Sequence, residues 1–283
     1  MIPRFDALLK LLFTANKPMS LLTLPEVLST EENAVGGIAV VTLPGFGPEL
    51  APKRRGVFFD NSVDRGRVLE QFIGWFDLWG IPVKRLRGTE GAFEKRFFTL
   101  EWPKNEIQNA HGPQTVKVIA SHIDEFLQVM QARQPRLVIF LSCYPWQAIN
   151  LEEIKPLLEP IFGLPLDEGR RITDKRLGAF LQHWQKCTVL ALPQPSKNTT
   201  ETIVRSFAGG VQSALQRSQS LPQQTVDPLL EAAGDCLVLD EEQSIRWIAV
   251  QLHVDHVRAQ KLFKALENKA YVREKNGKLR VKS

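Results

Sequence analysis

Three short apolar runs, each followed by a polar loop and then by a helical pattern, constrain the fold of this chain more than any other feature. The runs are Ile38–Leu43, Arg136–Leu141 and Cys187–Leu192. Runs of this length that are rich in valine, isoleucine and leucine are typical of strands buried on both faces of a parallel sheet. Because they alternate with helical patterns, the sequence predicts an α/β fold, with a mainly parallel sheet and helices on both faces. The loops after the three runs should then meet at the carboxyl edge of that sheet.

The segments between these runs carry weaker signals. The sequence predicts a short strand at Gly56–Phe59, a helix ended by Gly80, one helix over Val116–Gln131 and one over Thr200–Gln216. Lys84–Phe98 mixes cations with phenylalanines. That composition suits a basic hairpin or extended nucleic-acid surface, and equally an edge strand.

The loop after the third run is the best candidate for a site. Pro193 and Pro195 end the strand, since proline cannot donate to a sheet ladder. Thr199 or Thr200 can then cap the next helix. The loop carries four further polar residues: Gln194, Ser196, Lys197 and Asn198. Such loops bind ligands in open α/β sheets, although an ordinary strand-to-helix connection would also look like this.

Three motifs resemble those of the uracil-DNA glycosylase superfamily, in the order expected for that family. Gly45–Pro48 (GFGP) is similar to the family's Gly-x-x-Pro motif, and Gly56–Phe59 (GVFF) is similar to its Gly-x-x-Phe segment. Pro193–Asn198 (PQPSKN) is similar to its leaving-group loop. The resemblance implies the superfamily fold over residues 30–217, within a first domain of residues 1–217.

The resemblance also implies a base pocket in which an aromatic ring stacks on a flipped base. The pocket residues that it implies are Gly45, Gly47, Phe59, Ser142, Tyr144, Ser196 and Asn198. Gln194 stands where the family has histidine, and Gly47 stands where it often has a side chain that positions water. Gln194 could still donate a neutral hydrogen bond, and Asp60 could replace the missing carboxylate, so these two are the catalytic candidates. We therefore expect a degenerate site.

The last part of the chain has a different pattern. Residues 218–227 are polar and contain proline, as linkers do. Three helical segments follow within residues 228–283, and only His253-Val254 separates the second from the third, which is the helix-turn-helix spacing. Asn276-Gly277 then predicts a tight hairpin. This order predicts a winged helix, and it resembles the C-terminal gamma domain of bacterial DNA translocases.

A winged helix of this kind implies double-stranded DNA as the partner, with its third helix in the major groove. The alternative is that the winged helix contacts another protein. For the cations Lys53, Arg54 and Arg55, the simpler interpretation is a solvent-exposed loop tip. The candidate DNA-binding residues lie on two loops of the first domain, on the third helix and in the wing: Lys53, Arg54, Arg55, Lys197, His256, Arg258, Gln260, Lys261, Lys275, Lys278 and Arg280.

Net charge, cysteine content and the length of apolar runs narrow the kinds of partner, binding site and location that the chain can have. The net charge of +5 and the pI of about 9.1 are compatible with a polyanionic partner. The three cysteines form no CxxC pair, and His253 and His256 lack further ligands, so we expect neither a disulfide framework nor a metal site. No apolar run is long enough to cross a bilayer, and the first residues are unlike a secretory signal. We therefore expect a cytoplasmic protein with no membrane partner.

Two functions from different classes remain open. The favoured one is a DNA-binding protein whose glycosylase-like domain no longer removes bases. The alternative is an active DNA glycosylase with a non-standard catalytic set, and a protein-interaction module is a weaker third. The chain lacks the P-loop, nucleophile-elbow and dinucleotide motifs, so we expect no cofactor. Because winged helices often read DNA as dimers, a homodimer is a further expectation.

Overall fold

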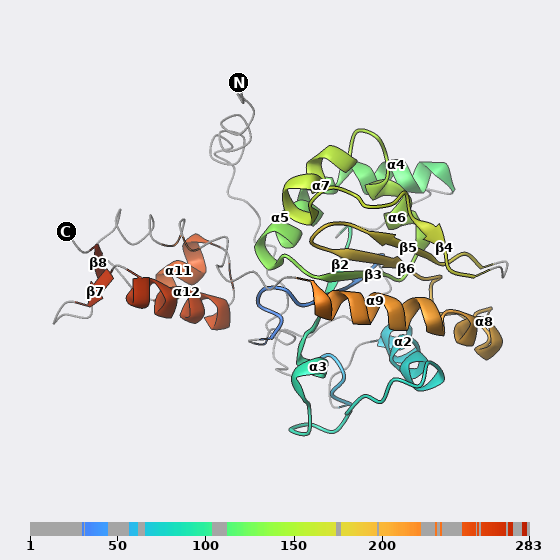
Figure 1. Cartoon of the computed structure of the whole chain (residues 1–283), viewed down its shortest axis with the longest axis horizontal. Coiled ribbons are helices and arrows are strands. Elements are labelled where there is room, and N and C mark those ends of the chain that lie inside the picture. The colour runs from blue at the N-terminus through green and yellow to red at the C-terminus, as the bar shows by residue number, and fades with distance from the viewer. Residues whose placement is uncertain are drawn as a thin grey trace.

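A computed structural model gives the fold. It describes residues 30, 32–44, 57–61, 66–103, 112–173, 177–196, 198–221, 230, 233, 245–252, 254, 256–269, 271–273 and 279–281 (Figure 1). Within these residues the structure confirms the predicted α/β fold, with a mostly parallel sheet between two layers of helices.

The sheet has six strands in the order β2-β1-β3-β6-β5-β4. Four of them run parallel: β1 (Ile38–Thr42), β2 (Phe97–Glu101), β3 (Leu137–Phe140) and β6 (Thr188–Ala191). Two shorter strands pair antiparallel at one side: β4 (Arg170–Arg171) and β5 (Phe180–His183). The three predicted strands are therefore β1, β3 and β6, and they are neighbours at the centre of the sheet.

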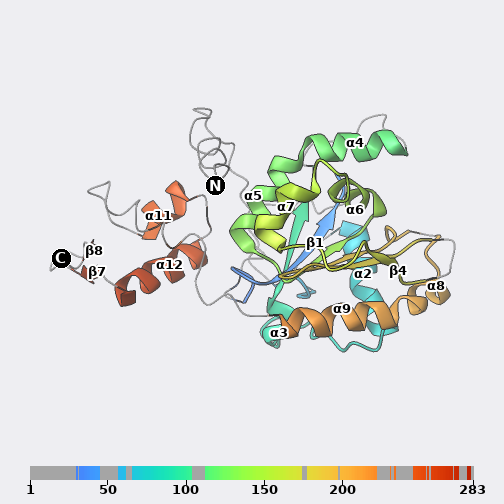
Figure 2. The same cartoon turned by 45° about the horizontal axis from the view of Figure 1, so that its top comes forward.

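Successive side chains of each central strand point to opposite faces of the sheet, so the apolar core has two parts, one on each face. Ile38 and Val40 of β1 face one apolar cluster, whereas Ala39 and Val41 face the other. The first cluster packs under α2 (Gly66–Leu78), α8 (Glu201–Ser206) and α9 (Ala208–Ser220). The second packs under α4 (Pro113–Ser121), α5 (Ile123–Arg133), α6 (Cys143–Ile149) and α7 (Lys155–Phe162). Figures 1 and 2 show these two groups of helices on opposite faces of the sheet.

Two predicted helices are each broken into two, and tertiary contacts explain where. The first helix stops at His122, which separates α4 from α5 and whose carbonyl oxygen accepts a hydrogen bond from Trp102 Nε1 at 2.8 Å. The second stops at Phe207, a fully buried ring between α8 and α9. Partners distant in the sequence decide both breaks. Helical periodicity alone could not place them.

The predicted strand at Gly56–Phe59 is wrong for its described part. Residues 57–60 form a turn, closed by the hydrogen bond from Asp60 N to Val57 O at 2.9 Å. Phe58 and Phe59 are fully buried and pack edge-on against each other, with ring centroids 5.0 Å apart. Two adjacent aromatic residues that both point inward do not show the alternation of a half-buried strand.

The basic segment from Lys84 to Phe98 is not a hairpin. An irregular stretch leads into the short helix α3 (Ala92–Lys95), and β2 then begins at Phe97 as an edge strand of the sheet. The buried carboxylate of Glu94 holds this stretch, because it accepts hydrogen bonds from the backbone N–H groups of Lys84 and Gly91, both at 2.9 Å. The edge-strand alternative therefore holds for the end of the segment.

Two predicted helix ends can be compared directly with the structure. Gly80 follows α2 with φ of +69°, as predicted for a residue that ends a helix. In contrast, α9 continues to Ser220, through the first residues of the predicted linker. Ser218 explains this difference, since it is fully buried and its hydroxyl donates to Leu215 O at 2.7 Å.

Within its described residues, the C-terminal unit contains two helices with defined bounds and one strand pair. They are α11 (Ile245–Gln251), α12 (His256–Lys269), β7 (Tyr271–Arg273) and β8 (Leu279–Val281). Strands β7 and β8 are antiparallel. The unit has a small core of its own: Leu230, Ala233, Ile248, Ala259, Leu262, Phe263 and Leu266. Both views show these elements grouped apart from the layers of the α/β domain (Figures 1 and 2).

Of the helices within the described residues, none combines the length and the apolar character that crossing a bilayer requires.

Candidate functional site

The strands β1, β3 and β6 end side by side at the carboxyl edge of the sheet. Backbone hydrogen bonds continue the ladder past the strand ends, from Leu141 N to Val41 O at 2.9 Å and from Leu192 N to Phe140 O at 2.8 Å. The chain runs from β1 to β2 on one side and returns to β3 on the other. Ligands in open α/β sheets bind at such a reversal of strand order, beyond the carboxyl ends of the strands.

The end of β3 contributes Ser142, Cys143 and Tyr144. Ser142 is buried and caps α6, and its Oγ accepts a hydrogen bond from Tyr144 N at 3.3 Å. The side chain of Tyr144 is exposed. Cys143 Sγ donates to Gly178 O at 3.2 Å, which joins α6 to the hairpin between β4 and β5. Ser142 and Tyr144 therefore lie directly after the carboxyl end of β3.

Cys143 was not predicted as part of the site, and it is no nucleophile near neutral pH. Burial raises the pKa of its thiol to about 11, and the nearby charge of Arg171 lowers it only in part. The thiolate is the reactive form of cysteine, so a raised pKa leaves the side chain neutral and unreactive. Its position directly after a buried strand was the sequence signal that could have found it.

The end of β6 contributes the edge loop, residues 193–200, which folds on itself. Ser196 Oγ accepts from Asn198 N at 3.3 Å, Thr199 N donates to Ser196 O at 3.0 Å, and Thr199 Oγ1 donates to Gln194 O at 3.1 Å. Ser196 and Asn198 are exposed and Gln194 is half-buried. Within the described part of the chain the side-chain amides of Gln194 and Asn198 make no hydrogen bond, so they can bind a ligand.

The β4–β5 hairpin is a third contributor, which the sequence did not predict. Arg171 pairs with Phe180, and Phe180 pairs with Ala191 at the end of β6, so the described residues 172, 173 and 177–179 lie beyond the carboxyl edge. Thr173 Oγ1 and Ser206 Oγ lie 3.0 Å apart and join the hairpin to α8. The hairpin places the guanidinium of Arg171 close enough to Cys143 to affect its thiol.

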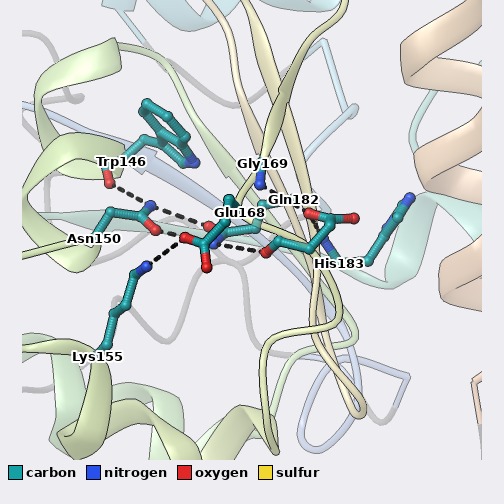
Figure 3. A network of polar contacts seen from close by, with 8 residues as sticks. Trp146, Asn150, Lys155, Glu168, Gly169, Gln182 and His183 are labelled. Carbon is teal, nitrogen blue, oxygen red and sulfur yellow. Dashed lines mark hydrogen bonds and ion pairs between the residues drawn. The ribbon is translucent and has the colours of Figure 1, made fainter. Parts of the chain in front are cut away.

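A buried polar network anchors the helix that follows the β3 loop (Figure 3). Asn150 and Gln182 exchange two amide hydrogen bonds, at 2.9 and 3.0 Å, and Gln182 is fully buried. Asp167 Oδ1 accepts from the backbone N–H groups of Gly169 at 2.9 Å and His183 at 3.2 Å. This network fixes the end of α6 to β5. It also fixes the hairpin relative to Tyr144.

The structure does not bring Phe59 and Asp60 to the carboxyl edge. Phe59 packs against Phe97 with ring centroids 4.8 Å apart, and Phe97 pairs with Ile38 at the opposite, amino edge of the sheet. Both Phe59 and Asp60 are fully buried. The length of a strand therefore separates them from Gln194, and the ring of Phe59 has no exposed face on which a base could stack.

In the C-terminal unit, the predicted third-helix residues divide between two faces of α12. His256, Gln260 and Lys261 are exposed. Arg258 is 1% exposed and lies among the buried residues of that unit, so its side chain is not on the outer face as predicted. Lys264 is exposed on the same face as His256 and Gln260, at spacings of four residues, and was not predicted.

The remaining predicted residues lie outside the described part of the chain: Gly45, Gly47, Lys53, Arg54, Arg55, Lys197, Lys275 and Lys278. Arg280 lies in β8, of which the structure describes the backbone path. Within the described residues, no three or more His, Cys, Asp or Glu side chains form a group that could hold a metal ion. A scan of protein-family models gives no match to this chain, and a search of curated proteins finds no relative.

Proposed function

We propose that this protein binds double-stranded DNA through its C-terminal unit and that its α/β domain keeps a glycosylase-like site without base-removing chemistry. One observation carries the proposal: α12 follows α11 after a short turn and is followed by an antiparallel strand pair, with a polar and cationic outer face. This order of elements suits a winged helix, in which the helix after the turn enters the major groove.

The two faces of α12 support this use. Its inner face buries Ala259, Leu262, Phe263 and Leu266 against Ile248 of α11. Its outer face presents His256, Gln260, Lys261 and Lys264. Lysines on such a face neutralise phosphates, and a glutamine can read a base edge. A protein-contact surface would more often present large apolar side chains at its centre.

The carboxyl edge supports ligand binding better than catalysis. Removal of a base needs a group that positions water and a donor that stabilises the leaving group. Gln194 replaces the family's histidine. Asp60 is buried at the other edge, and the thiol of Cys143 stays neutral. These features favour a site that holds a nucleotide without cleaving it.

An active glycosylase remains the second candidate, because one observation favours it. Tyr144 follows β3, and Gln194 and Asn198, whose side-chain amides make no hydrogen bond within the described residues, follow the neighbouring strand β6 at the edge where a flipped base would be held. A protein-interaction module, the third candidate, would be favoured if Lys53, Arg54 and Arg55 lay on a different face from the wing. Those residues lie outside the described part of the chain.

The test is duplex binding across a salt series by the full chain. Replacement of Lys261 and Lys264 by alanine should weaken binding and reduce the slope of log K against log salt by about 2, since each phosphate contact contributes about 1. Lys117→Ala, which removes an exposed lysine of α4, is the matched control and should change neither. Equal binding by the double variant and the wild type would contradict the proposal.

The catalytic alternative is tested in the same samples. A uracil-containing duplex is incubated with the protein and assayed for abasic sites. We expect none. Abasic product that is lost in Gln194→Ala, with duplex binding intact, would replace the non-catalytic proposal by the glycosylase. The stoichiometry of the complex, measured by light scattering, tests the expected homodimer.

A further inference from the structure

The amino edge of the sheet, where the parallel strands begin, carries two arginines on either side of β1. Arg96 directly precedes β2, and its carbonyl oxygen accepts from Ile38 N at 2.8 Å. Arg136 directly precedes β3, and its N–H donates to Gly37 O at 3.0 Å. The start of β1 therefore lies between the two. Alternation along β2 and β3 puts both side chains on the face that carries Phe98 and Val138, under α5.

Glycines at the start of β1 make this close arrangement feasible. A Cβ atom at Gly37 would lie 2.7 Å from Arg96 O, which is closer than real Cβ atoms approach an oxygen. A Cβ atom at Gly36 would lie 3.6 Å from Arg136 Nε, so the side chain of Arg136 extends across Gly36. The turn into β1 thus packs directly against the Arg96 carbonyl and leaves room for the Arg136 side chain, whose charge acts on Arg96.

Among the described residues, neither guanidinium has a counter-charge. In the part of the chain that the structure describes, the side chains of Arg96 and Arg136 make no ion pair and no hydrogen bond. Arg96 Nη2 is buried without a hydrogen-bond partner. The nearby carboxylate of Glu94 accepts from two backbone N–H groups.

The electrostatics agree with this geometry. Burial, and after it the charge of Arg136, lowers the pKa of Arg96, and burial lowers the pKa of Arg136. Both groups stay charged at neutral pH, because a guanidinium in a protein does not lose its proton. Two half-buried like charges without an acid between them are unfavourable unless a bound anion compensates them.

A third arginine, Arg133, also lies at this part of the amino edge. Arg133, at the end of α5, is buried, and its Nη1 donates to Asn33 O at 3.2 Å. Its guanidinium carbon also lies 5.5 Å from the centre of the Phe98 ring. Arg133 thus adds positive potential to the site but is held by its own contacts. Arg96 and Arg136 are the groups left to bind a ligand.

We propose that Arg96 and Arg136 form a binding site for a phosphate-type oxyanion at the amino edge of the sheet. Planar guanidinium groups bind phosphate oxygens in pairs, and a half-buried position strengthens those bonds. This site is distinct from the candidate site at the carboxyl edge and does not depend on the proposed DNA binding.

Two sources could supply the anion, a free phosphate compound or a DNA backbone. The course of the chain makes DNA a real source, because α9 ends at the amino edge. There Arg217 Nη2 donates to Trp184 O at 3.4 Å, and the C-terminal unit follows α9 in the sequence. A duplex held by that unit and a free phosphate compound would present the same oxygen atoms to Arg96 and Arg136.

The test uses the full chain and inorganic phosphate. Its thermal midpoint is measured in sodium phosphate and in sodium chloride of equal ionic strength. At a phosphate concentration ten times its Kd, the wild type should melt about 4 °C higher than in chloride. Arg96→Gln and Arg136→Gln should each abolish this difference. Arg205→Gln, which removes an exposed arginine of α8, should keep it.

The same variants separate binding from a structural role. Without phosphate, Arg96→Gln should melt no lower than the wild type, since it removes one of two uncompensated charges. Arg136→Lys keeps the charge but loses the planar fork, and it should raise the phosphate Kd about fivefold even where the glutamine variants fail to fold. A wild type that gains no more from phosphate than from chloride would overturn the proposal, as would a full phosphate response in the lysine and glutamine variants.

A salt series with duplex DNA then identifies the source. If the site binds the DNA backbone, Arg96→Gln should reduce the slope of log K against log salt by about 1. An unchanged slope together with a lost phosphate response identifies a free phosphate compound. The phosphate titration gives its answer even if the chain binds no DNA, so the two proposals can fail separately.

Discussion

The two edges of the sheet differ in how they treat charge. The described loops of the carboxyl edge present neutral polar groups, namely Ser142, Tyr144, Gln194 and Asn198, beside the guanidinium of Arg171 and the protonated thiol of Cys143. The amino edge holds three partly or fully buried arginines beside a tightly packed glycine turn. This difference indicates that the carboxyl edge, which follows the sequence motifs, is suited to hydrogen bonding with a ligand. The amino edge, which carries no motif, is suited to binding an anion.

The packing at the amino edge gives the largest expected effect. Gly37→Ala would put a Cβ atom 2.7 Å from Arg96 O and 2.9 Å from Asn33 Cα. Both are backbone atoms that cannot move aside cheaply, so we expect a loss of about 3 kcal/mol in the free energy of unfolding, measured by urea denaturation. Gly74→Ala in α2 is the control. A Cβ there has no atom within 4 Å, and better helix propensity should add about 0.5 kcal/mol. Equal stability of Gly37→Ala and the wild type would show that this edge is loosely packed.

The protonation state of the Cys143 thiol at the carboxyl edge can be tested directly. In a chain that also carries Cys187→Ala and Cys236→Ala, alkylation by iodoacetamide reports on this thiol alone. Its pKa of about 11 lies above the ordinary value of 9.0, so the thiolate fraction at pH 8 should be about a hundredfold lower than for an ordinary cysteine. The rate should rise with pH up to about 11, and Arg171→Gln should move the rise to higher pH. A rate that levels off below pH 9 would contradict the burial of this thiol.

The support of the carboxyl edge depends on the amide pair in Figure 3. Asn150→Ala leaves the amide of the fully buried Gln182 without its partner, and we expect a loss of about 2 kcal/mol in the free energy of unfolding. Adding Gln182→Met to Asn150→Ala should recover part of that loss, because an apolar side chain needs no partner there. Urea denaturation of the two variants measures the difference. A double variant that is less stable than Asn150→Ala would contradict this account of the pair.

The smallest effect concerns His183, near the amino edge. Burial lowers the pKa of this histidine, the charges of Arg217 and Arg170 lower it further, and Asp167 opposes them. A lowered pKa means that the folded chain binds the proton less well than the unfolded chain, so this contribution to stability is lost as the pH falls below 6.5. Arg217→Met should raise the pKa of His183 and reduce that loss. An NMR titration of the ring checks the direction of the change, and an unchanged pKa in Arg217→Met would contradict it.

Much of the fold follows from the sequence because its central strands are uniform. The apolar runs of β1, β3 and β6 can form little other than buried strands, and their order predicts the parallel sheet. Strands β4 and β5 were missed because they are short and because Gln182 in β5 is polar yet buried. Its partner Asn150 is 32 residues away. The breaks at His122 and Phe207 likewise depend on distant contacts.

Some residues of the candidate site could likewise be placed from the sequence, and others could not. Ser142, Tyr144 and Gln194 could be placed because each follows a recognisable strand. Phe59 could not be placed, because motif order does not say which edge of the sheet a loop approaches, and the aromatic residues of α2 determine where this ring is buried. Arg258 could have been placed, since it precedes Leu262 by four residues and so shares its inward face.

The amide pair of Asn150 and Gln182 also has a consequence for how the chain folds. Successive side chains of a strand point to opposite faces, so a shift of β5 by one residue along β6 would turn Gln182 away from α6 and put an apolar or basic side chain against Asn150. Only one alignment of β5 satisfies both amides. The pair therefore fixes the register of β5 against β6 on the antiparallel side of the sheet. In this way two side chains away from the carboxyl edge determine where the β4–β5 hairpin lies at that edge.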